Sequence, residues 1–247
     1  MMQRKGIDIS SFQGTPDFKR VKADGYEFVL IRAGYGKTQS KAFVPQITAA
    51  QAAGMDAGVY WYSYAESTAE AREEAAACLA AIKPYRLPYP VWFDQEYEPQ
   101  IKALTRQQRT DICKAFLGVI TQAGYFTGLY ASADWLTNWV DSSQLTAYDK
   151  WVAQYAPKVT YPGEYGIWQY GILGTQGRKG TDYTIFGQVD GVMGNCDVDY
   201  AYKDYPAIIQ NAGLNGYGKP CTGEAEWRMR ALAAEEKLAK IQKILSE

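Results

Sequence analysis

Two carboxylates lie two residues apart at the end of an apolar run. The stretch VWFDQE (91–96) has the pattern of a short buried strand that ends in Asp94 and Glu96. Side chains at positions i and i+2 of a strand share one face, about 6.6 Å apart along the backbone. In an aromatic pocket two such carboxyl groups do not both ionise easily, because burial and like charge raise one pKa. A protonated acid beside an ionised partner suits cleavage of a glycosidic bond, whereas a solvated acidic strand end is the alternative interpretation.

Acidic residues also occur at other predicted strand ends. Asp8 lies in GIDIS, and Asp197 and Asp199 lie in CDVDYAY. In a parallel α/β barrel the carboxyl ends of the strands meet at one end of the molecule. We therefore expect these acids to gather near Asp94 and Glu96. The longer Glu96 is the better candidate for the general acid. The spacing leaves open a retaining mechanism, an inverting mechanism, or one in which a substrate acetamido group attacks and Asp94 orients or stabilises it.

Aromatic residues surround these acids in the sequence, which contains 20 Tyr and 7 Trp. In GVYWYSY, Tyr60, Tyr62 and Tyr64 share one face of a predicted strand and Trp61 the other. Further aromatic residues occupy later strand candidates: Tyr130, Trp151, Tyr155, Trp168 and Tyr170. Such rings either fill the core or form flat, hydrogen-bonding surfaces on which sugars stack.

The composition excludes several classes of mechanism. The sequence has no histidine, so it contains neither a Ser-His-Asp triad nor a Cys-His pair nor a histidine-ligated zinc. A net charge of -1 gives no basic surface for nucleic acid or for an anionic membrane. Any acid–base chemistry must therefore be carried out by carboxylates, Tyr, Cys or Lys, and we predict no cofactor, no metal site, no nucleic-acid partner and no membrane insertion.

The cysteines form no C-x-x-C pair. We expect them to be small buried residues, although a link between Cys78 and Cys113 stays open: Cys78, Cys113, Cys196 and Cys221 are widely separated. The N-terminal residues MMQRKGIDIS lack the apolar segment of a signal peptide. No stretch approaches the ~20 apolar residues that cross a bilayer. We therefore expect synthesis in the cytoplasm and, if the protein leaves the cell, another export route.

Strand and helix candidates alternate through the first 140 residues and then give way to strands without long helices. The predicted strands cover 5–10, 27–33, 56–65, 91–96, 125–132, 150–156, 165–171 and 194–202. The predicted helices cover 15–25 (with Thr15 as N-cap), 42–54, 67–84 and 105–124. Repeated strand–helix units imply parallel strands with right-handed crossovers. The pattern predicts an α/β fold: an irregular, TIM-like (β/α)-barrel of five βα units plus three further strands.

The C-terminal part of the chain has a different pattern. We predict a catalytic barrel over residues 1–212, a Gly- and Pro-containing linker over 213–223 and an amphipathic helix over 224–247. Apolar positions in that helix are spaced alternately by four and three residues, from Trp227 to Leu245. The helix either packs on its own domain or makes a homo-oligomer.

Several motifs together resemble glycoside hydrolase family 25, the Chalaropsis-type lysozymes of bacteria, fungi and phage endolysins. They are GIDISSFQG, AAGMDAGVYWY, PVWFDQE, WVAQYA, GIWQYG and GNCDVDYAY, in this order across residues 4–206. The resemblance implies an irregular (β/α)-barrel and N-acetylmuramidase activity on bacterial peptidoglycan. It also implies that Glu96 is the general acid, Asp94 its carboxylate partner, and Asp8 and Asp197 supporting acids.

The resemblance extends to residues that would bind the substrate. Trp168 and Gln169 match the W-Q-Y strand of the family, and Gln154 and Tyr155 its A-x-Y strand. With the aromatic residues above, the predicted substrate-binding set is Tyr62, Tyr64, Tyr130, Gln154, Trp168, Gln169 and Asp199.

Two positions depart from the family pattern. Trp61 stands where histidine is usual, which we expect to reshape the cleft, and Asp199 stands where asparagine is commoner. The tail is not one of the usual wall-binding modules. A glycosidase on another amino-sugar polymer such as chitin, or a non-catalytic wall-binding barrel, remain alternatives. Release to the cell wall through a phage holin or non-classical export, or an extracellular location, would fit the resemblance.

Overall fold

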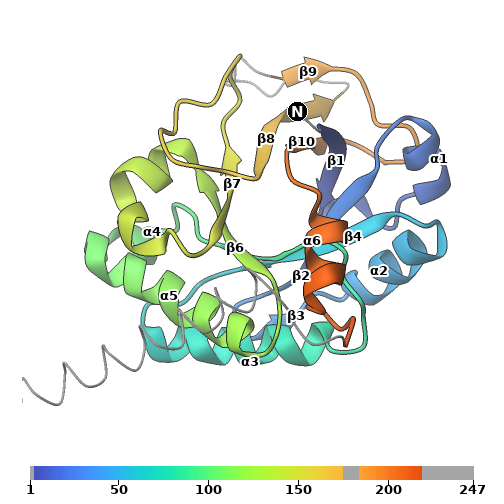
Figure 1. Ribbon diagram of the computed structural model, residues 1–247. Coiled ribbons are helices and arrows are strands. Elements are labelled where there is room, and N and C mark those ends of the chain that lie inside the picture. The colour runs from blue at the N-terminus through green and yellow to red at the C-terminus, as the bar shows by residue number, and fades with distance from the viewer. Residues whose placement is uncertain (1–2, 175–183, 219–247) are drawn as a thin grey trace, which may run out of the picture.

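The structure, a computed structural model, describes residues 3–174 and 184–218. Within them, a ring of eight strands closes into a barrel (Figure 1). The ring runs through β1 (Arg4–Ile9), β2 (Phe28–Tyr35), β4 (Asp56–Tyr62), β5 (Val91–Asp94), β6 (Thr127–Ser132), β7 (Asp149–Ala153), β8 (Ile167–Gly174) and β10 (Cys196–Ala201). Neighbours are parallel except at β10, which is antiparallel to both β1 and β8. The predicted α/β barrel is confirmed, with one strand reversed.

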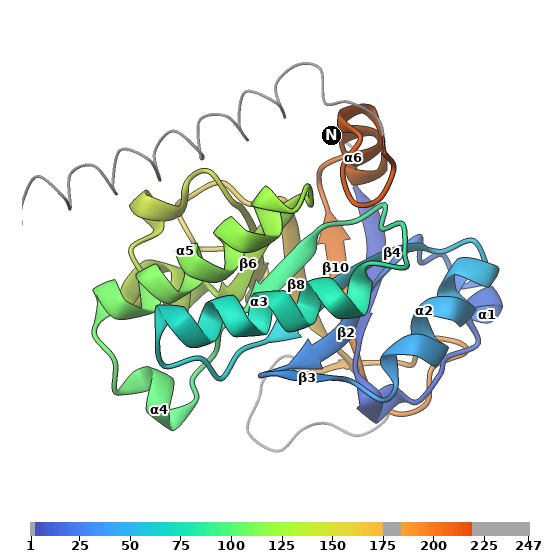
Figure 2. The same ribbon diagram turned by 90° about the horizontal axis from the view of Figure 1, so that it is seen from below.

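Two short strands lie outside this ring. β3 (Thr38–Gln39) pairs with β2, and β9 (Thr184–Phe186) pairs with β8. The helices are α1 (Phe18–Ala23), α2 (Phe43–Ala52), α3 (Thr68–Ile82), α4 (Pro99–Lys102), α5 (Arg106–Gln122) and α6 (Tyr205–Ala212). Shorter helical turns are η1 (Ser11–Gln13), η2 (Trp135–Trp139) and η3 (Ser142–Leu145). Figure 2 shows α6 at one end of the barrel and β3 and α4 at the other.

Helix starts follow from capping side chains. Ser67 Oγ accepts the N–H of Glu70 at the start of α3, and Thr105 forms a capping box with Gln108 at the start of α5. The predicted cap of the first helix is wrong, because Asp17 rather than Thr15 accepts two backbone N–H groups there. A carboxylate at this position also interacts favourably with the helix dipole.

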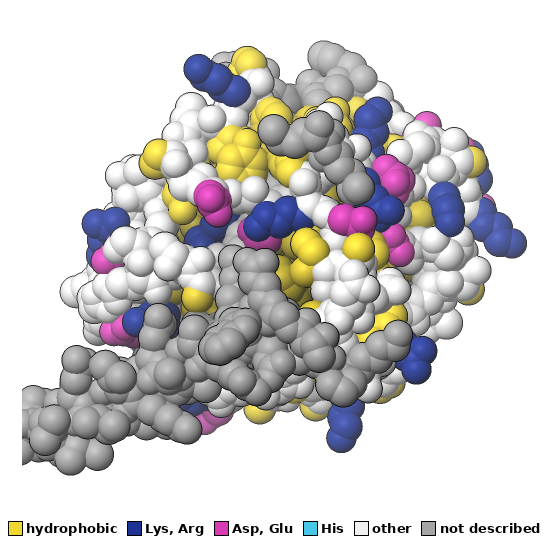
Figure 3. All heavy atoms as spheres, viewed as in Figure 1, with side chains coloured by type: hydrophobic (Ala, Val, Ile, Leu, Met, Phe, Trp, Pro, Cys, Tyr) yellow, Lys and Arg dark blue, Asp and Glu magenta, His cyan; other side chains and the backbone are white. Residues whose placement is uncertain are grey.

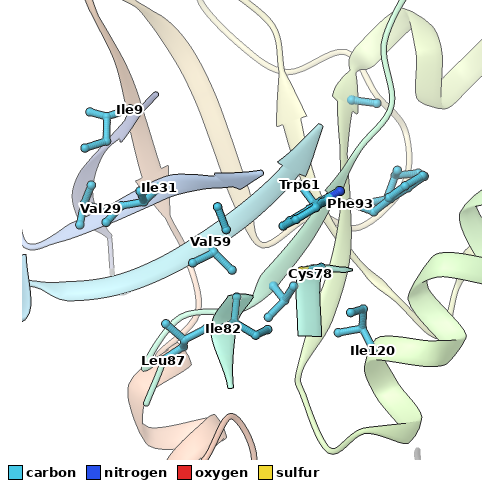
Figure 4. Packing of buried hydrophobic residues seen from close by; sticks show 14 of the residues in the cluster. Ile9, Val29, Ile31, Val59, Trp61, Cys78, Ile82, Leu87, Phe93 and Ile120 are labelled. Carbon is cyan, nitrogen blue, oxygen red and sulfur yellow. The ribbon is translucent and has the colours of Figure 1, made fainter. Parts of the chain in front are cut away.

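Strand alternation separates two apolar layers. On β2, Val29 and Ile31 point outward to the helices, and α3 contributes Cys78 and Ile82 to the same layer (Figure 4). Phe28 lies on the other face of β2, inside the barrel, with other large rings. The side-chain period of two therefore gives every strand one face toward the helices and one toward the barrel interior.

The cysteine and C-terminal predictions have different outcomes. Cys78 and Cys113 are buried free thiols, so the possible disulfide between them is not formed. The first residues of the predicted linker pack on the barrel: Leu214 is buried, and Asn215 Nδ2 donates to the carbonyls of Leu87 and Tyr89 at 2.9 Å. Cys221 and the predicted helix 224–247 lie outside the described residues.

No helix in residues 3–174 and 184–218 combines the length and apolar character needed to cross a bilayer. On the face drawn in Figure 3, basic and acidic side chains are interspersed and hydrophobic side chains occur in separate groups. This mixture agrees with the near-zero net charge of the sequence.

Candidate active site

A cavity of about 270 Å³ opens at the carboxyl ends of the parallel strands. Each strand of the ring, or the turn directly after it, contributes to its wall. The lining residues are Asp8, Arg32, Tyr60, Tyr62, Asp94, Glu96, Tyr130, Trp151, Tyr155, Gln169, Ile172 and Asp197. The structure thus brings together the four acids that the sequence assigned to catalysis, with Arg32 as the cation among them.

Asp94 and Glu96 are neighbouring carboxyl groups in the cavity, and each affects the pKa of the other. Asp94 ends β5 and is 2% exposed, whereas Glu96 follows the strand and is half-buried. Burial, and then the charge of Glu96, raise the pKa of Asp94 well above its usual range, although Arg32 opposes the rise. Burial, and then the charge of Asp197, raise the pKa of Glu96. Burial and like charge therefore both favour protonated carboxyl groups in this pair at pH values where an exposed carboxyl group is ionised.

A second polar network supports the other side of the cavity. Gln169 Nε2 donates to Asp8 Oδ2 at 2.7 Å, and its Oε1 lies 3.0 Å from the hydroxyl of Tyr130. The Tyr155 hydroxyl lies 3.0 Å from Asp197 Oδ1 and 3.1 Å from the same Gln169 oxygen. Since one hydroxyl proton serves one strong hydrogen bond, Tyr155 donates to either the carboxylate or the amide. The network orients both supporting acids from three different strands.

Asp199 lies deeper in the barrel than the acids of the cavity and is fully buried. Its Oδ1 accepts the indole N–H of Trp151 at 2.8 Å, whereas its buried Oδ2 has no hydrogen-bond partner among the described residues. Burial raises the pKa of both Asp8 and Asp199, and the charge of Asp197 raises each further. The predicted role of Asp199 in contacting substrate is not supported by this position, which instead places it beneath Asp8.

The remaining predicted substrate-binding residues divide between the cavity and its surroundings. Tyr62 and Tyr130 line the cavity, but Tyr64 lies beyond the end of β4, 43% exposed, with its ring centroid 5.2 Å from that of Tyr62. Trp168 alternates with Gln169 along β8 and therefore faces away from the cavity. Its indole N–H donates to the Gln154 carbonyl at 2.7 Å. Neither Trp168 nor Gln154 lines the cavity.

The expected effect of Trp61 on the cleft is also not found. Trp61 is fully buried on the helix-facing side of β4 and donates its indole N–H to the Gly36 carbonyl at 2.8 Å. The departure from histidine therefore changes the packing behind the strand, not the cavity wall.

Sequence reasoning missed two polar residues at this site. Arg32 continues the inward-facing series Phe28, Leu30, Arg32 along β2, a spacing that would have indicated it. Glu98, which lies beyond the end of β5, accepts the Tyr62 hydroxyl at 2.6 Å. Its charge also raises the pKa of Glu96, after burial and Asp197.

Comparison with known proteins agrees with this geometry. The profile of the glycosyl hydrolases family 25 matches residues 7–176. The CTP1L endolysin has 26% identity and a TM-score of 0.68, over 85% of this chain and 70% of that chain. The autolysin LytC from Streptococcus pneumoniae, solved with a synthetic peptidoglycan ligand, has 27% identity and a TM-score of 0.66, over 81% of this chain and 47% of that chain.

More distant structures show the same fold. The muramidase from Trichobolus zukalii superposes with a TM-score of 0.66 at 19% identity, over 87% of this chain and 100% of that chain. Among curated proteins no sequence match is found. The family profile covers more than half of the chain, and the matched range includes the carboxylates of β1 and β5. The chain therefore belongs to glycosyl hydrolases family 25.

Proposed function

We propose that this glycoside hydrolase is a muramidase, which cleaves the β-1,4 bond between N-acetylmuramic acid and N-acetylglucosamine in peptidoglycan. The observation that carries the proposal is that Asp94 and Glu96, two carboxyl groups with raised pKa values, line one cavity of a family 25 barrel. The relatives named as endolysin, autolysin and muramidase, one of them solved with a peptidoglycan ligand, support this substrate.

Glu96 is the general acid in this proposal. It is the longer and less buried member of the pair, so its carboxyl group reaches further toward the cavity opening. Burial and the charges of Asp197 and Glu98 favour its protonated form, which the leaving sugar oxygen requires, although Asp94 opposes this rise in pKa. After it has donated its proton, Glu96 is ionised. The resulting carboxylate then activates the water molecule that completes hydrolysis.

Asp94 stabilises the positive charge that develops at the anomeric carbon. Its carboxylate either attacks this carbon directly or orients the 2-acetamido group of the substrate, which attacks in its place. Asp8 and Asp197, fixed by Gln169 and Tyr155, add hydrogen-bonding groups on the opposite wall. Together these groups stabilise a transition state whose positive charge is absent from the ground state.

Product analysis tests the proposed bond specificity. Purified Gram-positive peptidoglycan is digested with the protein, the new reducing ends are reduced with borohydride, and the fragments are identified by mass spectrometry. A muramidase leaves N-acetylmuramic acid at the reducing end, so reduced muramic acid is the expected terminus. N-acetylglucosamine at that end, or cleavage of chitin in preference to peptidoglycan, would contradict the proposal, and binding without any new reducing end would support the non-catalytic alternative.

A further inference from the structure

Arg32 lies in an acidic cavity and lowers the pKa of Asp94, but it forms no salt bridge in the part of the chain that the structure describes. Its side chain is on the inward face of β2, near the carboxyl end of the strand, and Arg32 is paired with Tyr60 of β4. Four carboxyl groups line the same cavity, yet within the described residues Arg32 forms no salt bridge with any of them. A guanidinium group that is positioned by the strand but not neutralised is available to an anion from outside.

The surroundings of Arg32 hold the guanidinium group while leaving donors free. Nη2 donates to Ser11 Oγ at 3.0 Å, and buried Nε has no acceptor among residues 3–174 and 184–218. The guanidinium carbon lies 5.7 Å from the ring centroid of Phe12 and 5.8 Å from that of Tyr35. Both distances are within the range of cation–π interactions, which use none of the hydrogen-bond donors of the guanidinium group.

The two rings are themselves unusually exposed for such residues. Phe12 is 86% exposed and Tyr35 is 40% exposed, and both follow or end strands whose carboxyl ends surround the cavity. Phe12 therefore contributes little to the core. A planar cation between two exposed rings is the chemistry that recognises a carboxylate on an otherwise apolar or amide-rich group.

The substrate class of the proposed function offers such a group in one place. The repeating sugars of peptidoglycan carry acetamido and hydroxyl groups without charge, whereas the lactyl ether of muramic acid bears a peptide with free carboxylates. We propose, resting on the proposed function, that Arg32, Phe12 and Tyr35 form a subsite for a carboxylate of this peptide stem. The enzyme would then distinguish glycan strands that carry stems from bare strands.

A substrate comparison with Arg32→Gln tests this subsite. One substrate is peptidoglycan with intact stems, and the other is the same glycan after an amidase has removed the stems. Because Arg32 also lowers the pKa of Asp94, the variant affects both reactions, so the measured quantity is the ratio of kcat/KM on the two substrates. This ratio should fall tenfold or more in Arg32→Gln, through KM on the stem-bearing substrate, and less in Arg32→Lys, which keeps the charge but not the planar fork.

Phe12→Ala is a second test variant. Because Phe12 is exposed, its replacement should not disturb folding. It should lower the same ratio of kcat/KM values by a smaller factor than Arg32→Gln. An unchanged ratio in Arg32→Gln, with both substrates affected equally, would overturn the subsite. Calorimetric titration with a free stem peptide keeps this test separate from the proposed function. Binding to the wild type that is lost in Arg32→Gln supports the subsite even if neither glycan is cleaved, and binding that survives the substitution, or no binding at all, overturns it.

Discussion

The barrel interior contains two regions that differ in chemistry although the same strands build both. Toward α6, aromatic rings fill the space: the centroid of Trp92 lies 5.8 Å from that of Trp151 and 6.2 Å from that of Tyr205. At the opposite end, carboxyl groups line an open cavity. On β5 the change takes two residues, from inward-facing Trp92 to inward-facing Asp94.

This difference between the two regions explains why the pKa values of the carboxyl groups are raised. The aromatic region excludes water from the side of the acids that faces α6. Burial is the largest cause of the raised pKa of Asp8, Asp94, Glu96 and Asp199. Mutual charge between the acids is the second contribution for most of them. The apolar half of the barrel thus sets the protonation state of the polar half.

The largest expected effect separates two glutamates in the same turn. Glu96→Gln removes the proposed acid, and we expect kcat to fall by about a thousandfold or more. Glu98→Gln is the matched control, because its amide oxygen still accepts the Tyr62 hydroxyl, and the rate should change by less than about tenfold. Release of reducing ends from peptidoglycan gives both rates. If Glu98→Gln were as damaging as Glu96→Gln, the assignment of the acid would be wrong.

Asp94→Asn should have the next largest effect. The amide preserves shape but does not stabilise positive charge at the anomeric carbon, so we expect a loss in kcat of about a hundredfold or more. Circular dichroism and a thermal melt would verify that the fold is retained. A variant with more than a third of the wild-type kcat would show that this carboxylate is a structural residue.

Asp199→Asn should give the smallest effect and the opposite sign, a gain in stability. An amide keeps the acceptor for Trp151 and avoids burial of a carboxylate, so unfolding free energy at pH 7 should rise by about 1 kcal/mol, or about 2–4 °C in Tm. Because the pKa of Asp199 is raised in the fold, the carboxyl group lowers stability only as pH rises above its unfolded value of about 4. The gain should therefore vanish in melts near pH 3, and a constant gain at all pH values would contradict this explanation.

The sequence predicted the site best where alternation and position at strand ends were sufficient. Asp8, Asp94, Glu96 and Asp197 were placed correctly at the cavity because parallel strands bring their carboxyl ends together. The same rule, applied strictly to β8, would have separated Trp168 from Gln169, since neighbouring residues on a strand face opposite sides.

Other features depended on tertiary structure that local patterns do not contain. β10 runs antiparallel to both of its neighbours, β1 and β8, and nothing in the sequence CDVDYAY indicates this direction. Glu98 acquires its contact with Tyr62 only because the chain turns after β5 into α4. The late start of α1 reflects competition between two capping residues two positions apart, of which the carboxylate Asp17 makes the bonds.

The central claim is that the aromatic half of the barrel keeps a proton on the Asp94–Glu96 pair, and a carboxyl titration tests it directly. Carbon-13 NMR of the free enzyme, with Glu96→Gln and Asp94→Asn used to assign the signals, reports the pKa of each group. We expect at least one step of the pair well above the ordinary value of about 4, at the same pH at which kcat/KM declines on the alkaline side. Ordinary titration of both carboxyl groups near pH 4 would contradict the account.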